Sequence, residues 1–247
     1  MNSITNKTDS IDFVSRERER IRVEYDRRAR EIDPDRYASW QPAEKFTIAN
    51  RNRAALAMLR LAHAFPVAGE CLEVGCGSGG WLSQLESWGV DAEHLHGIDL
   101  DADRARQARA NLPQAEIRIG DAVELPWTAG TFQVVIASTL FTSVLDSRVR
   151  QLIADEIQRV LAPGGVLLWY DFAYNNPRNP NVRGIKRGEI RTLFPTLDGQ
   201  IRSVTLGPPL ARLLAPKSRK LAQLLESVPP LRTHLMAVLV KASNGCP

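Results

Sequence analysis

The chain is poor in the residues that build metal centres and disulfide frameworks. It has three cysteines, Cys71, Cys76 and Cys246, and four histidines in 247 residues. The cysteine spacing fits neither a disulfide framework nor a zinc site, so we interpret all three as reduced thiols. His94 and His96 form a pair, but no third ligand stands near them. We therefore expect no metal.

Long apolar runs are also missing. No stretch reaches the roughly 18 apolar residues of a membrane-spanning helix, and residues 1–14 lack the basic-then-apolar order of a signal peptide. These absences predict a soluble, cytoplasmic protein. The length suits one α/β core with extensions, and no internal repeat is visible.

Charge is unevenly distributed along the chain. Residues 61–171 contain 7 Lys/Arg against 15 Asp/Glu, whereas residues 172–247 contain 12 against 3. The basic final third favours an anionic acceptor or surface, although arginines that only solubilise exposed helices explain it equally well. Within it, the leucine-rich and basic residues 208–228 predict helical structure. That segment either covers the sheet or touches an anionic membrane from outside.

The most informative segment is CLEVGCGSGG at residues 71–80. Its apolar residues predict a strand, which ends in three glycines at alternate positions, Gly75, Gly77 and Gly79. Only glycine lets the backbone turn this tightly while a ligand lies against it. The free N–H groups of the helix predicted to follow would face the turn and bind polar ligand groups. This pattern predicts a nucleotide-cofactor loop.

Two cofactors fit such a loop. Gly75, Gly77 and Gly80 have the spacing of a dinucleotide-binding turn, with Asp99 at the expected distance downstream. Glu73 argues against a dinucleotide, because its carboxylate would repel a pyrophosphate and attract a cationic amino acid group. Asp121 supplies a further acid at the end of the third predicted strand, where an acceptor can meet an adenine amino group.

With these motifs in this order, and with LAPGGVLLWYD at 161–171, the segment 65–171 resembles the class I S-adenosylmethionine-dependent methyltransferases. The resemblance implies S-adenosylmethionine as the cofactor. It assigns the ribose hydroxyls to Asp99 and the adenine to the strand end at Asp121. One departure is that the family's usual Phe-Asp before the fourth strand is Phe132-Gln133 here, which affects no expected cofactor contact. The expected cofactor-binding residues are Glu73, Gly75, Gly77, Gly79, Asp99, Leu100, Asp121, Ala122 and Ser138.

Short strands alternate with helical segments from residue 70 to residue 171, which predicts a parallel sheet with helices on both faces. Two later strands, near 200–206 and 233–241, match the family's seven-stranded sheet. The expected fold is therefore α/β: a Rossmann-like, doubly wound, mostly parallel sheet with an antiparallel last strand. Residues 1–64 are expected to form a helical extension or lid, and residues 65–247 the methyltransferase domain.

The resemblance implies transfer of a methyl group, and the loose likeness of WYDF and NNPRNP to small-molecule enzymes favours O-methylation of a polar metabolite or glycan. Asp171 is the first candidate for a base, with Tyr170 beside it, because it leaves the fifth strand at the pocket rim. The candidate substrate-binding residues are Tyr25, Tyr37, Trp40, Asn175, Asn176, Arg178 and Arg183.

Three alternatives stay open at this stage. They are a nicotinamide-dependent oxidoreductase, a protein that binds the cofactor without catalysis, and an RNA-binding relative of the methyltransferases. IASTLF after the fourth strand lacks the Asp/Asn-Pro-Pro-aromatic element that holds a flipped base, which disfavours a nucleic acid substrate. The sequence does not determine the oligomeric state.

Overall fold

The computed structural model describes residues 5–177 and 179–243. Its centre is a seven-stranded sheet in the order β3-β2-β1-β4-β5-β7-β6. β7 runs antiparallel to both β5 and β6, whereas the other neighbouring strands pair in parallel. The predicted Rossmann-like sheet with an antiparallel last strand is confirmed. The strands are β1 (Cys71–Val74), β2 (Leu95–Asp99), β3 (Glu116–Ile119), β4 (Phe132–Ser138), β5 (Leu161–Phe172), β6 (Leu197–Leu206) and β7 (Arg232–Lys241).

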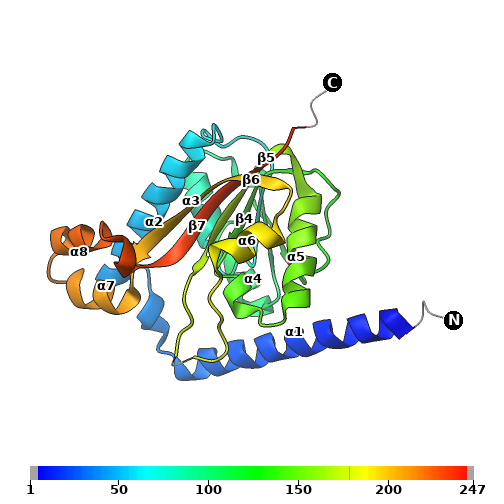
Figure 1. Cartoon of the computed structure of the whole chain (residues 1–247), viewed down its shortest axis with the longest axis horizontal. Coiled ribbons are helices and arrows are strands. Elements are labelled where there is room, and N and C mark those ends of the chain that lie inside the picture. The colour runs from blue at the N-terminus through cyan, green and yellow to red at the C-terminus, as the bar shows by residue number, and fades with distance from the viewer. Residues whose placement is uncertain (1–4, 178, 244–247) are drawn as a thin grey trace.

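Helices cover both faces of this sheet (Figure 1). One apolar cluster joins α2, α3 and α4 to one face, and a second joins α5 and α6 to the other. The helices are α1 (Thr5–Glu31), α2 (Pro42–Leu61), α3 (Gly80–Ser87), α4 (Ala102–Asn111), α5 (Ser147–Val160), α6 (Arg187–Leu193), α7 (Pro208–Leu214) and α8 (Arg219–Glu226). Short 3₁₀ turns lie at Pro34–Tyr37, Ala92–His94, Phe141–Ser143 and Pro229–Leu231.

The central strands form because their side chains are apolar on both sides. All four residues of β1 are buried, and Val134–Ala137 of β4 are buried as a continuous run. A strand between two helical layers needs such a run, since neither of its faces meets water. Each fully buried aliphatic side chain contributes about 1.5–3 kcal/mol. This core holds the carboxyl ends of β1, β2, β3 and β4 at one edge of the sheet.

Helix α1 crosses that carboxyl edge (Figure 1). Phe13, Val14 and Ile21 pack against the apolar core from above. Polar contacts hold the same helix: the Glu17 carboxylate accepts a hydrogen bond from the Leu145 amide. Helix α1 therefore closes the edge at which ligands of open α/β sheets bind.

The segment 208–228 forms two helices, α7 and α8, rather than one. The chain breaks near Pro216, and the Ser218 hydroxyl caps α8 by accepting from the Leu221 amide at 3.3 Å. The pair packs on α2 and on the end of β6 through a small cluster that includes Phe46 and Leu206. The expectation that the leucines cover the sheet is therefore only partly right, because one row of them faces outward.

Candidate cofactor and active site

The glycine turn lies between β1 and α3 with the predicted backbone. Gly75, Gly77 and Gly79 have φ angles of 72°, 53° and 84°, which side chains disfavour. A Cβ on Gly77 would also lie 2.6 Å from a guanidinium nitrogen of Arg104. Gly80 differs, because it is helical and a Cβ there would meet nothing within 4 Å. The third glycine of a dinucleotide turn serves close helix–strand packing, a role that Gly80 does not fill.

Glu73 is a buried carboxyl beneath this turn, with 4% of its surface exposed. Among the described residues, its Oε2 has no hydrogen-bond partner. Burial raises the pKa of Glu73 to about 8. A buried carboxyl oxygen without a hydrogen-bond partner is unusual in a folded protein, and a cationic ligand group could supply that partner.

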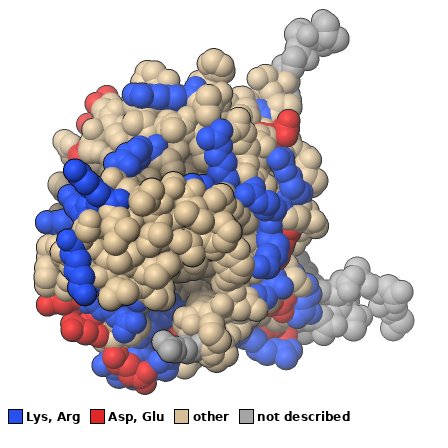
Figure 2. All heavy atoms as spheres, turned by 60° about the vertical axis from the view of Figure 1, so that its left-hand side comes forward, with Lys and Arg blue, Asp and Glu red and all other residues tan. Residues whose placement is uncertain are grey.

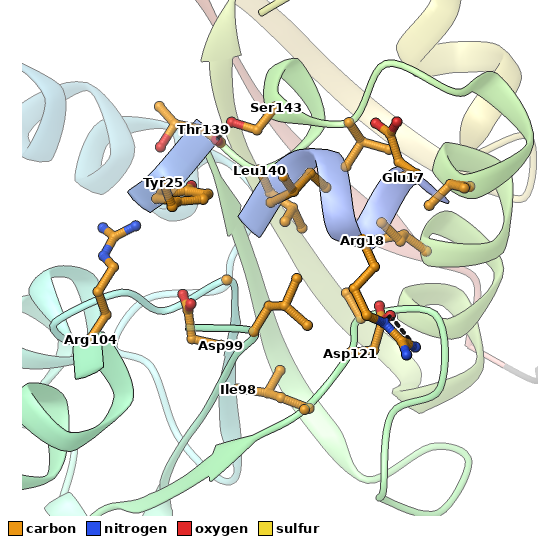
Figure 3. Close-up of a pocket in the computed structure, with 18 of the residues that line it drawn as sticks. Glu17, Arg18, Tyr25, Ile98, Asp99, Arg104, Asp121, Thr139, Leu140 and Ser143 are labelled. Atoms are coloured by element: carbon orange, nitrogen blue, oxygen red, sulfur yellow. Dashed lines mark hydrogen bonds and ion pairs between the residues drawn. The ribbon is translucent and has the colours of Figure 1, made fainter. Parts of the chain in front are cut away.

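Asp99 ends β2, and its side chain faces the pocket (Figure 3). One carboxylate oxygen accepts from the Gly77 amide at 2.7 Å, and the other accepts from the Asp101 amide at 2.9 Å. Each oxygen of an ionised carboxylate can accept more than one hydrogen bond. Asp99 therefore fixes the glycine turn and still has acceptor capacity toward the pocket.

Asp121 follows β3 and opens on the same pocket, together with Leu100 and Ala122. In this structure its Oδ2 accepts from Nε of Arg18 at 2.8 Å, and its Oδ1 accepts from the Val123 amide at 3.1 Å. The dashed pair in Figure 3 shows that Arg18 reaches Asp121 from α1. The predicted adenine acceptor is thus the contact point of the covering helix.

Ser138 ends β4 and lines the pocket, as expected from its position. The next residue, Thr139, has a φ of 52°, which is rare for a β-branched side chain. Its amide donates to the Tyr170 carbonyl at 2.7 Å. Backbone held in such a conformation marks functional loops in many proteins. Sequence reasoning did not single out Thr139, since nothing in IASTLF reveals the backbone angle.

Tyr25, one of the three aromatic candidates, reaches this site. It projects from α1 into the pocket lining, and the Arg104 guanidinium lies 5.2 Å from its ring centroid (Figure 3). Trp40 is 57% exposed and does not line the pocket. The side chain of Tyr37 lies outside the described residues. The part of the pocket that water can enter has a volume of about 100 Å³.

Asp171 is not at the pocket rim. It is 1% exposed, and its oxygens accept from the Thr142 amide at 3.0 Å, the Thr142 hydroxyl at 2.5 Å and the Phe172 amide at 2.9 Å. Burial raises the pKa of Asp171 to about 6. Tyr170 is also buried, and its hydroxyl pairs with that of Thr205 at 3.0 Å. These contacts give both side chains a structural environment, because β5 continues past the expected rim.

In the polar loop after β5, several side chains bond to other groups of the protein. The Asn175 side chain accepts from the Gly184 amide at 2.9 Å. The Arg183 guanidinium pairs with Glu189, and its amide donates to the Thr142 carbonyl. The loop also reaches the covering helix, since the side-chain amide of Asn181 donates to the Glu24 carboxylate at 2.7 Å. Asn176 is exposed, and Arg178 lies outside the described residues. None of Asn175, Asn176 and Arg183 lines the described pocket.

Arg51 is a site residue that sequence reasoning missed. Its guanidinium carbon lies 4.0 Å from the Trp81 ring centroid and 5.9 Å from that of Tyr170. Burial lowers the pKa of Arg51, while the nearby Glu73 acts in the opposite direction. The signal was available, because Arg51 stands on the face of α2 that also carries the buried Ala55. A charged residue at a buried-face position needs a partner.

Glu44 lies two turns before Arg51 on the same helix and is also partly buried. Burial raises the pKa of its carboxyl, and Arg212 and Arg51 oppose that shift. Nearby, His234 is buried and stacks on Tyr170, with ring centroids 4.8 Å apart. Burial lowers the pKa of His234 to about 3, so its ring is neutral near physiological pH. The α2 side of the edge therefore presents one carboxyl and one guanidinium.

The described residues contain no group of three or more side chains arranged to hold a metal ion. His94 and His96 pair instead with Glu70, and His96 also contacts Glu116. These contacts lie at the amino end of β2, away from the pocket. The described part of the chain likewise contains no helix with the length and apolar character to cross a membrane.

Comparison with known proteins bears on the same region. The methyltransferase domain family matches residues 71–165, which run from β1 to the turn within β5. This match agrees with the resemblance to the class I S-adenosylmethionine-dependent methyltransferases that the sequence motifs indicated. This family carries S-adenosylmethionine as its cofactor, as the sequence motifs predicted. The methyltransferase domain thus contains every strand end that lines the pocket.

Two curated relatives illustrate the likeness. The ubiquinone/menaquinone biosynthesis C-methyltransferase UbiE of Syntrophotalea carbinolica is 33% identical over 138 residues, which are 54% of this chain and 56% of the relative. The fatty-acid O-methyltransferase of Mycolicibacterium smegmatis is 36% identical over 102 residues, which are 40% of this chain and 36% of the relative. The matches with curated relatives span between 32% and 58% of each relative's length.

Solved structures share the fold. A methyltransferase from Methanosarcina mazei superposes with a TM-score of 0.56 at 19% identity, over 75% of this chain and 98% of that one. One from Archaeoglobus fulgidus gives 0.56 at 14% identity, over 80% and 97%.

The residues of this site fit the family's cofactor. The unpaired oxygen of Glu73 suits an ammonium group, the three glycines add no side chains of their own to the turn, and Asp99 and Asp121 present acceptors along one pocket. The amino acid end, the ribose and the adenine each find a group of matching chemistry.

Proposed function

We propose that the chain binds S-adenosylmethionine at this edge of the sheet and transfers its methyl group to a small acceptor. One observation carries the proposal: the glycine turn, Asp99 and Asp121 open on one covered pocket, and one oxygen of the buried Glu73 carboxyl has no hydrogen-bond partner among the described residues. Dinucleotides need no such carboxyl. The role of Gly80, which packs against nothing, further disfavours the nicotinamide alternative.

The residue assignments follow the chemistry of each group. Glu73 would hold the ammonium of the cofactor, and Arg51 its carboxylate. Asp99 would accept from the ribose hydroxyls, while Asp121, Leu100 and Ala122 would surround the adenine. Bound S-adenosylmethionine supplies an electrophilic methyl group on a sulfonium. The protein's task is then to align the acceptor and to exclude water, and α1 serves the second purpose.

Calorimetry tests the cofactor assignment. We expect S-adenosylmethionine to bind with micromolar affinity, and Asp99→Ala and Gly77→Val to abolish the heat. Asp91→Ala, which changes an exposed acid at the other end of β2, is the matched control. If the wild-type chain gives no heat, or if a nicotinamide cofactor alone raises its melting temperature, the proposal is wrong.

For the acceptor we propose a hydroxyl on a small polar metabolite or glycan. The support is the α2 side of the edge, where the partly buried carboxyl of Glu44 can accept a proton. A carboxyl with a raised pKa is a better base near neutral pH than an ordinary one. In this proposal Asp171 positions the loop at Thr142 and does not take the proton. A cytoplasmic location stays a prediction.

Labelled methyl transfer to a panel of hydroxyl acceptors tests this second step. Glu44→Gln should lower kcat by roughly 10²-fold or more with little change in cofactor affinity. Glu86→Gln, an exposed acid on α3, should leave kcat unchanged. Cofactor binding without transfer to any acceptor would instead favour a non-catalytic protein.

A further inference from the structure

Four exposed apolar side chains form a surface that we call the α8 face. Leu213 lies on α7, Leu221 and Leu224 lie on α8, and Val228 follows α8. Their exposed fractions are 55%, 44%, 64% and 41%. Figure 2 shows the corresponding side of the molecule, where a broad surface without charged residues is bordered by Lys and Arg. Soluble proteins seldom expose such a row unless something binds it.

The fold does not need these side chains. The same helices bury another row, Ala211, Ala215 and Ala222, against Phe46 and Leu206. Leu221 and Leu224 are three residues apart, so they lie on one side of α8, and Val228 follows the end of that helix. Polar residues at these positions would reduce the stability of α7 and α8 little. The leucines are thus free to serve an interaction.

The border of the α8 face has one sign of charge. Arg212, Lys217, Arg219 and Lys220 are exposed around it. Residues 207–232 hold five Lys/Arg and a single acid, Glu226, which is turned toward the Asn50 side chain. Apolar side chains within a cationic border match the composition of an anionic membrane surface.

A pocket between α2 and α8 adjoins this border. Its lining includes Asn50, Arg53, Arg219 and Gln223, with Phe46 at its base. Its two guanidinium groups and the Gln223 side-chain amide are donors suited to phosphate oxygens, whereas the Asn50 side-chain amide already donates to Glu226. The pocket thus adds a headgroup-binding element beside the apolar row.

Other occupants fit the charges less well. A second copy on the α8 face would bring two cationic borders together, which is repulsive. A nucleic acid would pair with the border, but it would leave the exposed leucines without a partner, since stacking on bases requires aromatic side chains. A bilayer containing anionic phospholipid satisfies both the apolar row and the border.

We propose that the α8 face docks on an anionic phospholipid bilayer, with its leucines at the boundary of headgroups and acyl chains and its basic border on the lipid phosphates. The contact is interfacial, since α7 and α8, with 7 and 8 residues, are too short to span a bilayer. It does not depend on methyl transfer. Arg212 also acts electrostatically on Glu44, so docking would bring the acceptor side of the edge close to the membrane.

Vesicle co-sedimentation of the full chain tests the proposal. We expect binding to vesicles of phosphatidylcholine with phosphatidylglycerol, weaker binding to phosphatidylcholine alone, and a decline as salt rises. The double variant Leu221→Ser/Leu224→Ser should weaken binding at least 10-fold. Its control is Leu152→Ser, which changes a leucine on α5 that is 37% exposed. Lys217→Glu/Lys220→Glu should weaken binding roughly 30-fold or more.

Each variant is first checked by its melting temperature and by S-adenosylmethionine calorimetry, which separates loss of docking from loss of the cofactor site. Equal binding to both vesicle types, no binding to either, or unchanged binding by both double variants would overturn the proposal. A dimer that Leu221→Ser/Leu224→Ser dissociates would show that the face is an interface between copies. Retention on RNA but not on vesicles would identify a nucleic acid partner instead.

Discussion

Arg18 of α1 and Asp121 at the end of β3 form an ion pair, with Nη2 and Oδ2 2.7 Å apart. The two residues are far apart in sequence, and the pair lies at the edge of the cofactor pocket (Figure 3). It ties the covering helix to the strand end that the family uses for adenine. Closure of the helix and the adenine site are therefore coupled through one carboxylate.

Loss of this pair should loosen the covering helix. We expect Arg18→Ala to weaken S-adenosylmethionine binding about 2- to 5-fold, because a partly exposed ion pair contributes roughly 0.2–1 kcal/mol. The weaker binding should appear mainly as a faster dissociation of S-adenosylmethionine, measured by stopped flow. Arg22→Ala removes an exposed arginine one turn further along α1 and is the control. Equal dissociation rates in the two variants would show that the pair does not hold the helix closed.

Cofactor binding should release a proton from Glu73. Burial holds the pKa of this carboxyl at about 8, so it is protonated near neutral pH until a cationic group lies beside it. Calorimetry at about pH 7 in buffers of different ionisation enthalpy should detect the release. Glu73→Gln should release none and bind more weakly. Proton release that persists in Glu73→Gln would contradict this account.

The same carboxyl makes stability depend on pH. Its folded pKa exceeds its unfolded value of 4.5, so the folded chain binds the extra proton between these pH values. The stability it contributes is complete below the unfolded pKa and is lost as pH rises through about 8. The slope should be about 1.4 kcal/mol per pH unit in that window. Urea unfolding of Glu73→Gln should show a smaller slope than the wild type.

The buried strands were predictable because burial on two faces leaves a direct trace, as in the apolar run Val134–Ala137, whereas the antiparallel last strand was expected from the resemblance to the family. The acids at strand ends were also predictable, since Asp99 is the last residue of its apolar strand. The course of α1 was not, because its few apolar positions indicate edge packing without showing which edge. The base assignment shows the same limit: the sequence does not reveal that Thr142 folds back onto Asp171.

Arg51 is a site residue whose role is indicated by the structure and was not predicted from the sequence. It lies against Trp81 and acts on Glu73 electrostatically, and only the fold brings α2 to the glycine turn. Arg51→Met keeps the apolar stem and removes the charge. We expect it to weaken S-adenosylmethionine binding about 10-fold or more, by loss of a charge-assisted pair to the amino acid carboxylate.

A cofactor analogue separates that role from packing. 5′-Methylthioadenosine lacks the amino acid group, so its affinity should not change in Arg51→Met. The control is Arg60→Ala, which changes another arginine of α2. Its guanidinium carbon lies 5.2 Å from the ring centroid of Phe65, and its loss should leave both affinities unchanged. A parallel loss of affinity for both ligands would assign Arg51 a purely structural role.

Asp171→Asn distinguishes a positioning carboxyl from a base. Asp171 accepts three hydrogen bonds from Thr142 and Phe172, and an amide nitrogen in place of one oxygen cannot accept. We expect a loss of about 2 kcal/mol in the free energy of unfolding, measured with urea. Methyl transfer should fall only several-fold, through displacement of the loop after β4. As a base, Asp171 would instead give a fall of several orders of magnitude at unchanged stability.

The pH dependence and a double-mutant cycle make this test specific. The folded pKa of Asp171 is about 6 against an ordinary 3.8, so its stabilising contribution is full below 3.8 and declines as pH rises through 6. Asp171→Asn should lack that decline. Thr142→Val should reproduce much of the loss, and the two changes together should cost less than their sum, because each breaks the same contact. Asp198→Asn, at a fully exposed acid on β6, should change neither stability nor turnover. Additive losses would mean that the hydrogen bonds between Thr142 and Asp171 do not hold the loop in place.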